Sequence, residues 1–96
     1  MKKEFNKIKN NQLKELQQIP GVGKSIATDL WNIGIKCIND LKNKNPEKLY
    51  NTSNQFVGTK QDQCLLYVFR CAVYFASTPH PDAKKLKWWY WKNKTL

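Results

Sequence analysis

The feature that most constrains the fold is a turn sequence, Ile19-Pro20-Gly21-Val22-Gly23-Lys24-Ser25, which lies between two helical patterns. Residues 12–18 before it are rich in helix formers, and residues 24–33 after it place apolar side chains on one helical face. Pro20 fixes φ at the first turn position, and Gly21 can adopt a positive φ at the next. The pattern therefore predicts a tight corner between two short helices.

The same corner has the features of an anion site. Gly23 has no side chain, so another molecule can approach its backbone closely. Lys24 and Ser25 begin the following helix, where unpaired N–H groups and the positive end of the helix dipole favour an anion. We expect Gly21, Gly23, Lys24 and Ser25 to bind a phosphate, and Val22 to anchor the loop in the core.

Two nucleotide-binding motifs share part of this string, and neither is complete. A P-loop needs a glycine at the position that Gln18 occupies, and a dinucleotide fingerprint needs one at Ile26. Both motifs also follow a β-strand, whereas residues 12–18 favour a helix. Neither ATP nor NAD is indicated, and no cofactor is expected.

Composition favours a polyanionic partner. The 96 residues are enough for one small domain, and 17 basic against 7 acidic residues give a formal net charge of +10. Such a charge attracts polyanions, of which nucleic acid is the commonest inside a cell. Net charge alone does not locate a patch, so a lysine-rich composition that serves only solubility stays open.

No strand pattern appears, and we expect an all-α fold. Residues 1–11 form a polar lead-in that is expected to fray, residues 12–78 the helical domain, and residues 79–96 a tail packed on it. Asn45, Asp62 and Asp82 are expected to cap helices, and Gly34 to end one. The expected helical segments are about 11–18, 24–33, 39–42, 46–54 and 62–77, with a short helix after Asp82. Segment 62–77 has a wide apolar stripe that includes Cys64, and Arg70 lies roughly opposite that stripe.

Two family resemblances follow from these residues. Leu16, Ile19, Gly21-Val22-Gly23, Ala27, Leu30 and Gly34-Ile35 resemble the signature of helix-hairpin-helix proteins. Residues 45–50, 68–76 and 86–92 are similar to the small bacterial "pathogenicity locus" family, and that similarity spans about residues 12–92. The family name records a genomic location, so it implies a fold and little mechanism.

The helix-hairpin-helix resemblance implies DNA binding through backbone phosphates without sequence specificity. The matching donors are the amides of Gly21, Gly23, Lys24 and Ser25, and in some members a monovalent cation bridges hairpin carbonyls, here those of Gln17, Ile19 and Val22. Such hairpins often occur in pairs. The segment Val57-Gly58-Thr59-Lys60 matches a second hairpin without a Gly-x-Gly, and Lys60 and Arg70 are further candidates there.

The tail Trp88-Trp89-Tyr90-Trp91 has two interpretations. It lies among Lys84, Lys85, Lys87, Lys92 and Lys94, and aromatic rings between lysines can stack on unpaired bases. Alternatively, the rings dock over a small core, which we favour because large aromatic residues are mostly buried. A division, with some rings buried and one exposed, is compatible with both.

Catalytic and metal sites are not expected. Cys64 and Cys71 are separated by about 10.5 Å of helix, too far for a disulfide or a shared zinc ion, so the cysteines are interpreted as structural thiols. The only histidine, His80, stands between two prolines, and the carboxylates are scattered singly. We expect a protein that is not an enzyme on its own.

These observations together predict a compact, all-α, cytoplasmic domain of the helix-hairpin-helix type that binds DNA. No signal peptide or membrane-spanning run is visible, and the odd number of cysteines suits reduced thiols. Duplex, single-stranded and junction DNA are not distinguished, nor is RNA. The alternative is an adaptor that uses the domain or the tryptophan tail to bind another protein of a repair or recombination assembly.

Overall fold

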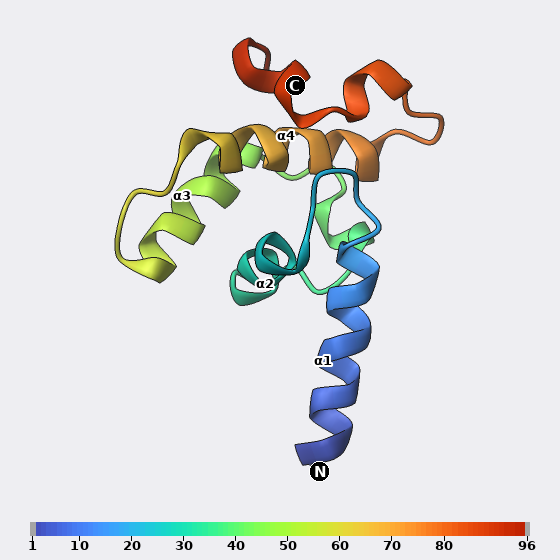
Figure 1. Ribbon diagram of the computed structural model, residues 1–96, viewed down its shortest axis with the longest axis vertical. Coiled ribbons are helices and arrows are strands. Elements are labelled where there is room, and N and C mark those ends of the chain that lie inside the picture. The colour runs from blue at the N-terminus through green and yellow to red at the C-terminus, as the bar shows by residue number, and fades with distance from the viewer. Residues whose placement is uncertain (1, 96) are drawn as a thin grey trace.

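All regular secondary structure in the computed structural model, which describes residues 2–95, is helical (Figure 1). The predicted all-α class is confirmed. The elements are, in chain order, α1 (Lys2–Leu16), α2 (Lys24–Asn32), the 3-10 helix η1 (Ile38–Leu41), α3 (Pro46–Val57), α4 (Gln63–Ser77), and the 3-10 helices η2 (Ala83–Leu86) and η3 (Trp88–Asn93).

Helix α4 is the centre of the fold. It lies between the tail on one side and the α1–α2 pair on the other, and α3 packs against it as well (Figure 1). Phe69 of α4 is fully buried. The core around it consists of apolar side chains from every α-helix and from the turns: Leu13, Leu16, Ile19, Val22, Ala27, Leu30, Ile35, Leu41, Tyr50, Leu65, Val68, Ala72 and Val73.

Helix α1 is longer than the sequence suggested. It begins at Lys2, so most of the lead-in that was expected to fray is helical. Its first nine residues contain no glycine or proline and include several lysines, which tolerate a helix well. Two side chains near its C-terminal end fix it to the domain, because Gln12 accepts a hydrogen bond from the Trp31 indole at 2.9 Å and Glu15 accepts one from the Ile38 amide at 2.7 Å.

The helix ends follow the predicted capping residues. The side chain of Asn45 accepts hydrogen bonds from the amides at the start of α3, and those of Asp62 and Asp82 do the same for α4 and η2. Gly34 has a φ of 98°, and the Ile35 amide folds back to the Leu30 carbonyl at 3.0 Å. Helix α3 continues three residues beyond the expected end, to Val57, where left-handed Gly58 stops it.

The tail packs on α4, and its rings are divided between core and surface. Trp91 is only 4% exposed, lies 5.4 Å from the Tyr74 ring, and donates its indole N–H to the Lys85 carbonyl at 2.8 Å. Trp89 is 56% exposed, and Trp88 is half-buried against the core. The sequence analysis allowed this division, and the structure shows which ring belongs to each group.

The cysteines differ in environment. Cys71 is fully buried, and burial raises the pKa of its thiol to about 11, so it stays neutral near pH 7. Cys64 was expected on the apolar stripe of α4, but it is exposed in the first turn of that helix. No helix within residues 2–95 combines the length and the apolar character that crossing a bilayer needs.

Candidate functional site

The residues between α1 and α2 form the predicted corner, and together with the first two residues of α2 we call them the glycine turn (residues 17–25). Gly21 has a φ of 84°, a conformation that non-glycine residues rarely adopt. Val22 is 5% exposed, and its amide donates to the Ile19 carbonyl at 3.0 Å. Val22 therefore anchors the turn in the core, as expected, and its amide is already used inside the protein.

Four further amides of the corner are open. Gly21, Gly23, Lys24 and Ser25 are all exposed, and no acceptor among the described residues pairs with their backbone N–H groups. The first hydrogen bond of α2 is the one from the Ala27 amide to the Gly23 carbonyl at 2.9 Å. The N-terminus of α2 thus presents unpaired donors at the positive end of a helix dipole.

Gly23 is not required by the geometry of the chain. Its φ of −90° and ψ of −172° are accessible to any residue, and a Cβ at this position would meet no atom within 4 Å. Serine, threonine, aspartate or asparagine at this N-cap would supply the side-chain acceptor that Asn45 and Asp62 supply to α3 and α4. The fold therefore explains Gly21 but leaves the choice of glycine at position 23 unexplained.

The charges at the start of α2 are also unusual. Its first turn contains Lys24 and no acidic residue, although the helix dipole favours the opposite sign there. A bound anion would neutralise both the lysine and the free amides. The exposed amides and the lysine beside them are therefore a candidate anion site.

A groove of about 400 Å³ borders the glycine turn on the side of α4. Partial burial raises the pKa of Asp29 in this groove, while the hydrogen bond from the Cys64 amide lowers the pKa of Asp62. The two carboxylates place negative charge on this side of the glycine turn, which disfavours an anion in the groove itself. The lining residues are Gly21, Ile26, Asp29, Gln61, Asp62, Cys64, Leu65, Val68 and Trp88.

The second turn (residues 58–62) has a different arrangement. The amides of Gly58 and Thr59 donate to the Asn54 carbonyl, and the Gln61 amide donates to the Asn54 side chain. The carboxylate of Asp62 occupies the N-terminus of α4. An anion would therefore find a like charge at this helix end, unlike at α2.

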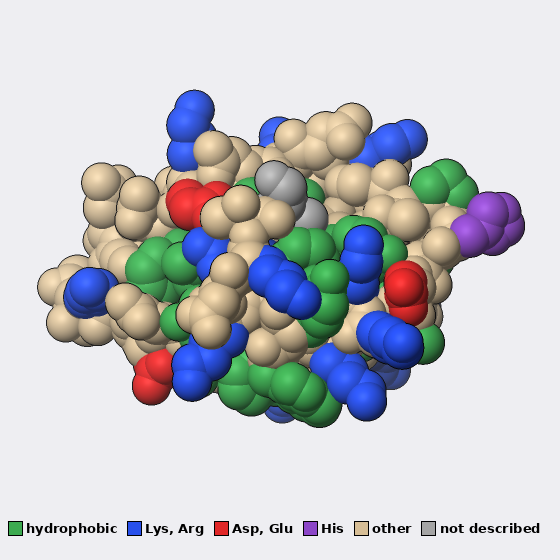
Figure 2. Space-filling model, turned by 90° about the horizontal axis from the view of Figure 1, so that it is seen from above, with side chains coloured by type: hydrophobic (Ala, Val, Ile, Leu, Met, Phe, Trp, Pro, Cys, Tyr) green, Lys and Arg blue, Asp and Glu red, His purple; other side chains and the backbone are tan. Residues whose placement is uncertain are grey.

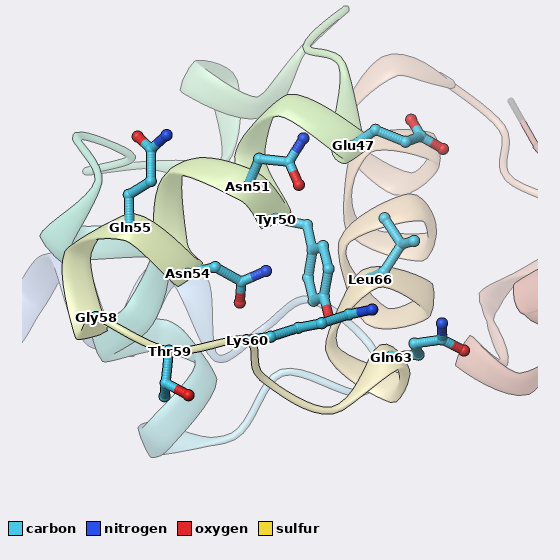
Figure 3. Close-up of a pocket in the computed structure, with 10 residues that line it drawn as sticks. All are labelled: Glu47, Tyr50, Asn51, Asn54, Gln55, Gly58, Thr59, Lys60, Gln63 and Leu66. Carbon is cyan, nitrogen blue, oxygen red and sulfur yellow. The ribbon is translucent and has the colours of Figure 1, made fainter.

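The groove beside the second turn, of about 670 Å³, is lined mainly by uncharged polar side chains (Figure 3). Tyr50 points into it, and exposed Lys60 extends across it toward α4 (Figure 3). Of the site residues expected at the second turn, Lys60 is thus accessible to a ligand. The other lining residues are Glu47, Asn51, Asn54, Gln55, Gly58, Thr59, Gln63 and Leu66.

Arg70 has an internal role in the structure. Its side chain is 12% exposed and pairs with Glu47 of α3 at 3.1 Å. Its Nη1 also donates to the Trp91 carbonyl at 2.9 Å. The sequence analysis placed Arg70 opposite the apolar stripe as a ligand contact, but the guanidinium joins α3, α4 and η3. Its bonds across three elements could not be seen from the periodicity of one helix.

The monovalent cation implied by the family resemblance would need the carbonyls of Gln17, Ile19 and Val22. The Ile19 oxygen already accepts the Val22 amide, which leaves one lone pair for an ion. No group of three or more histidine, cysteine, aspartate or glutamate side chains in the described part of the chain could hold a metal ion. The cation stays a prediction.

Sequence reasoning missed two neighbours of the glycine turn. The Trp88 ring lies against Gly21, with its Cδ1 3.4 Å from the position of a Cβ built there. Asp29 lies in the adjoining groove. Trp88 was noted for its lysine-rich surroundings, but its contact with a residue 67 positions earlier depends on how the tail folds over α4.

A family model described as "Pathogenicity locus" (Cdd1) matches residues 9–95. The match covers nearly the whole chain, and the protein therefore belongs to this family. Comparison with curated proteins and with solved structures finds no match.

Proposed function

We propose that this member of the pathogenicity locus family binds DNA through backbone phosphates, with the glycine turn acting as a hairpin of the helix-hairpin-helix type. The phosphate contacts are the amides of Gly21, Gly23, Lys24 and Ser25, and the Lys24 ammonium adds a positive charge. The protein acts in this proposal by binding alone, without a catalytic step. A role in DNA repair or recombination would use such a contact.

The observation that carries the proposal is the glycine at position 23. The backbone there is ordinary and the space around it is empty, so the fold itself does not require a glycine. A ligand that approaches the main chain closely does require one, because any side chain would stand between the ligand and the amides. Phosphate oxygens accept hydrogen bonds from helix N-termini in this way.

The charge of the chain supports a nucleic acid rather than a small phosphate. The formal net charge is +10, and exposed lysines are spread over several elements. Amide–phosphate contacts hold the backbone and read no bases, so we propose binding without sequence preference. The lysines raise the association rate and make the affinity sensitive to salt. Lys60 is an additional phosphate contact at the second turn.

We expect Lys24→Glu to weaken DNA binding about tenfold or more, because it removes a charge-assisted contact and places a repelling carboxylate beside the phosphate. Fluorescence anisotropy with a short labelled duplex measures the affinity, and circular dichroism checks the fold. The matched control is Lys7→Glu, which changes the net charge equally on exposed residue 7 of α1, away from the glycine turn. The control variant should lose much less affinity.

The salt dependence of both variants completes the test. Log K falls linearly with log salt concentration when phosphates are neutralised, and loss of one contact lowers the slope by about one. Equal affinities of the Lys24→Glu and Lys7→Glu variants for DNA would show that the glycine turn does not bind it.

The second candidate function is that of a protein-interaction adaptor. Phe56 and Val57, at the C-terminal end of α3, are exposed large apolar side chains of the kind that protein interfaces bury. An interface anchored by such residues should depend only weakly on salt. A strong salt dependence of the affinity for the physiological partner favours DNA, and a weak one favours the adaptor.

A further inference from the structure

The tail connects an exposed tryptophan, Trp89, to the glycine turn through the ring of its neighbour Trp88. Half-buried Trp88 contacts Gly21, with its Cβ 3.7 Å from the position of a Cβ built on that glycine. The Trp89 ring packs edge-to-face on Trp88, with 5.7 Å between the ring centroids. Trp89 is therefore linked to the corner with the free amides through the Trp88 ring, which contacts both.

Packing does not account for the exposed ring. Trp91 is buried and anchors the tail, whereas Trp89 leaves 56% of its surface to solvent. Large apolar surfaces that stay exposed on a small protein often mark a binding site. The Trp89 ring is of this kind, because more than half of its surface stays accessible although it packs against Trp88.

A positive charge lies near the ring, on a tail that is rich in lysine. The Lys87 ammonium lies 5.8 Å from the Trp89 ring centroid. Lys84, Lys92 and Lys94 of the tail are exposed as well. Figure 2, which views the molecule from the side of the tail, shows basic side chains interspersed with hydrophobic ones and few acidic ones. An aromatic ring among lysines complements a ligand that has both flat apolar faces and negative charges.

We propose that Trp89 stacks on an unpaired nucleobase of the same DNA strand whose phosphate is held at the glycine turn. The inference rests on the proposed function and names its substrate: DNA with unpaired bases, either single-stranded or at a junction with duplex. Inside an intact duplex both faces of each internal base are covered by neighbouring bases, so the ring gains little there. An unpaired base offers a free face, and aromatic–base stacking tolerates every sequence.

The test uses three labelled probes in fluorescence anisotropy. They are a single strand, a strand of the same length in which every nucleotide lacks its base, and a blunt duplex. The abasic strand has the same phosphates but no base on which the Trp89 ring could stack. We expect the wild-type protein to bind the single strand more tightly than the abasic strand. Trp89→Ala should weaken binding to the single strand about tenfold and leave the other two probes unchanged.

Trp89→Phe keeps an aromatic face and should retain most of the preference for the single strand. Equal losses of Trp89→Ala on the single and abasic strands, or no loss on either, would overturn the stacking proposal. If Trp89 instead binds a protein or a membrane, Trp89→Ala should cause no loss on either strand. Lys24→Glu separates the two proposals, because it should weaken binding to all three probes even if Trp89 proves irrelevant to each of them.

Discussion

Gly23→Asp is expected to stabilise the protein and to remove most of its DNA binding. The new carboxylate would accept hydrogen bonds from the first amides of α2 and interact favourably with the helix dipole. The expected gain is a few tenths to about 1 kcal/mol in the free energy of unfolding, or a few degrees in Tm. Because the carboxylate then occupies the position of the phosphate, the affinity for DNA should fall at least about tenfold.

Two controls separate the site from general effects. Asn10→Asp adds the same charge on the exposed part of α1 and should change the affinity only slightly. Gly23→Ala adds a methyl group where no atom lies within 4 Å, so the fold should persist while the ligand is obstructed. A Gly23→Asp variant that gains stability and still binds as the wild type does would show that the phosphate is held elsewhere.

Trp91→Ala is expected to cost about 3–5 kcal/mol in the free energy of unfolding. The indole is buried, packs against Tyr74 and Tyr90, and donates to the Lys85 carbonyl. Its removal leaves a cavity and only the weak Cys71 thiol as a donor to that carbonyl. A protein of this size has a total stability of about 5–15 kcal/mol, so the loss is a large fraction of it. Urea unfolding followed by circular dichroism measures the difference.

Trp89→Ala is the matched comparison. Its ring is exposed, and surface substitutions usually change stability by less than about 0.5 kcal/mol. If Trp89→Ala and Trp91→Ala lower the free energy of unfolding equally, the division of the tail into one anchoring ring and one exposed ring is wrong. The comparison is also the folding control for the stacking test, since it shows whether Trp89→Ala acts on binding rather than on folding.

Features that depend on a few neighbouring residues could be predicted from the sequence. Asn45, Asp62 and Asp82 cap their helices because an acceptor side chain needs only the amides two or three residues ahead. Gly34 ends α2 in the left-handed conformation for a similarly local reason. The exposed, unpaired amides of the glycine turn belong to this group, because a helix that begins at Lys24 has free N–H groups regardless of the rest of the fold.

Features that depend on distant contacts could not be predicted. Helical periodicity gave Arg70 an outward position, but Glu47 and the folded tail surround it there. The contact between Trp88 and Gly21 needs the path of the tail over α4, which no local pattern contains. That the fold itself does not require a glycine at position 23 also emerged only from the structure, since the space around a Cβ is a property of packing.

The most direct test of the phosphate site is an NMR titration of the ¹⁵N-labelled protein with a short single-stranded DNA. We expect the amide resonances of Gly21, Gly23, Lys24 and Ser25 to shift together and to saturate at one common affinity that weakens with salt. The Val22 amide, which is bonded to Ile19, should shift less. Binding that leaves these four resonances in place while others move would contradict the account.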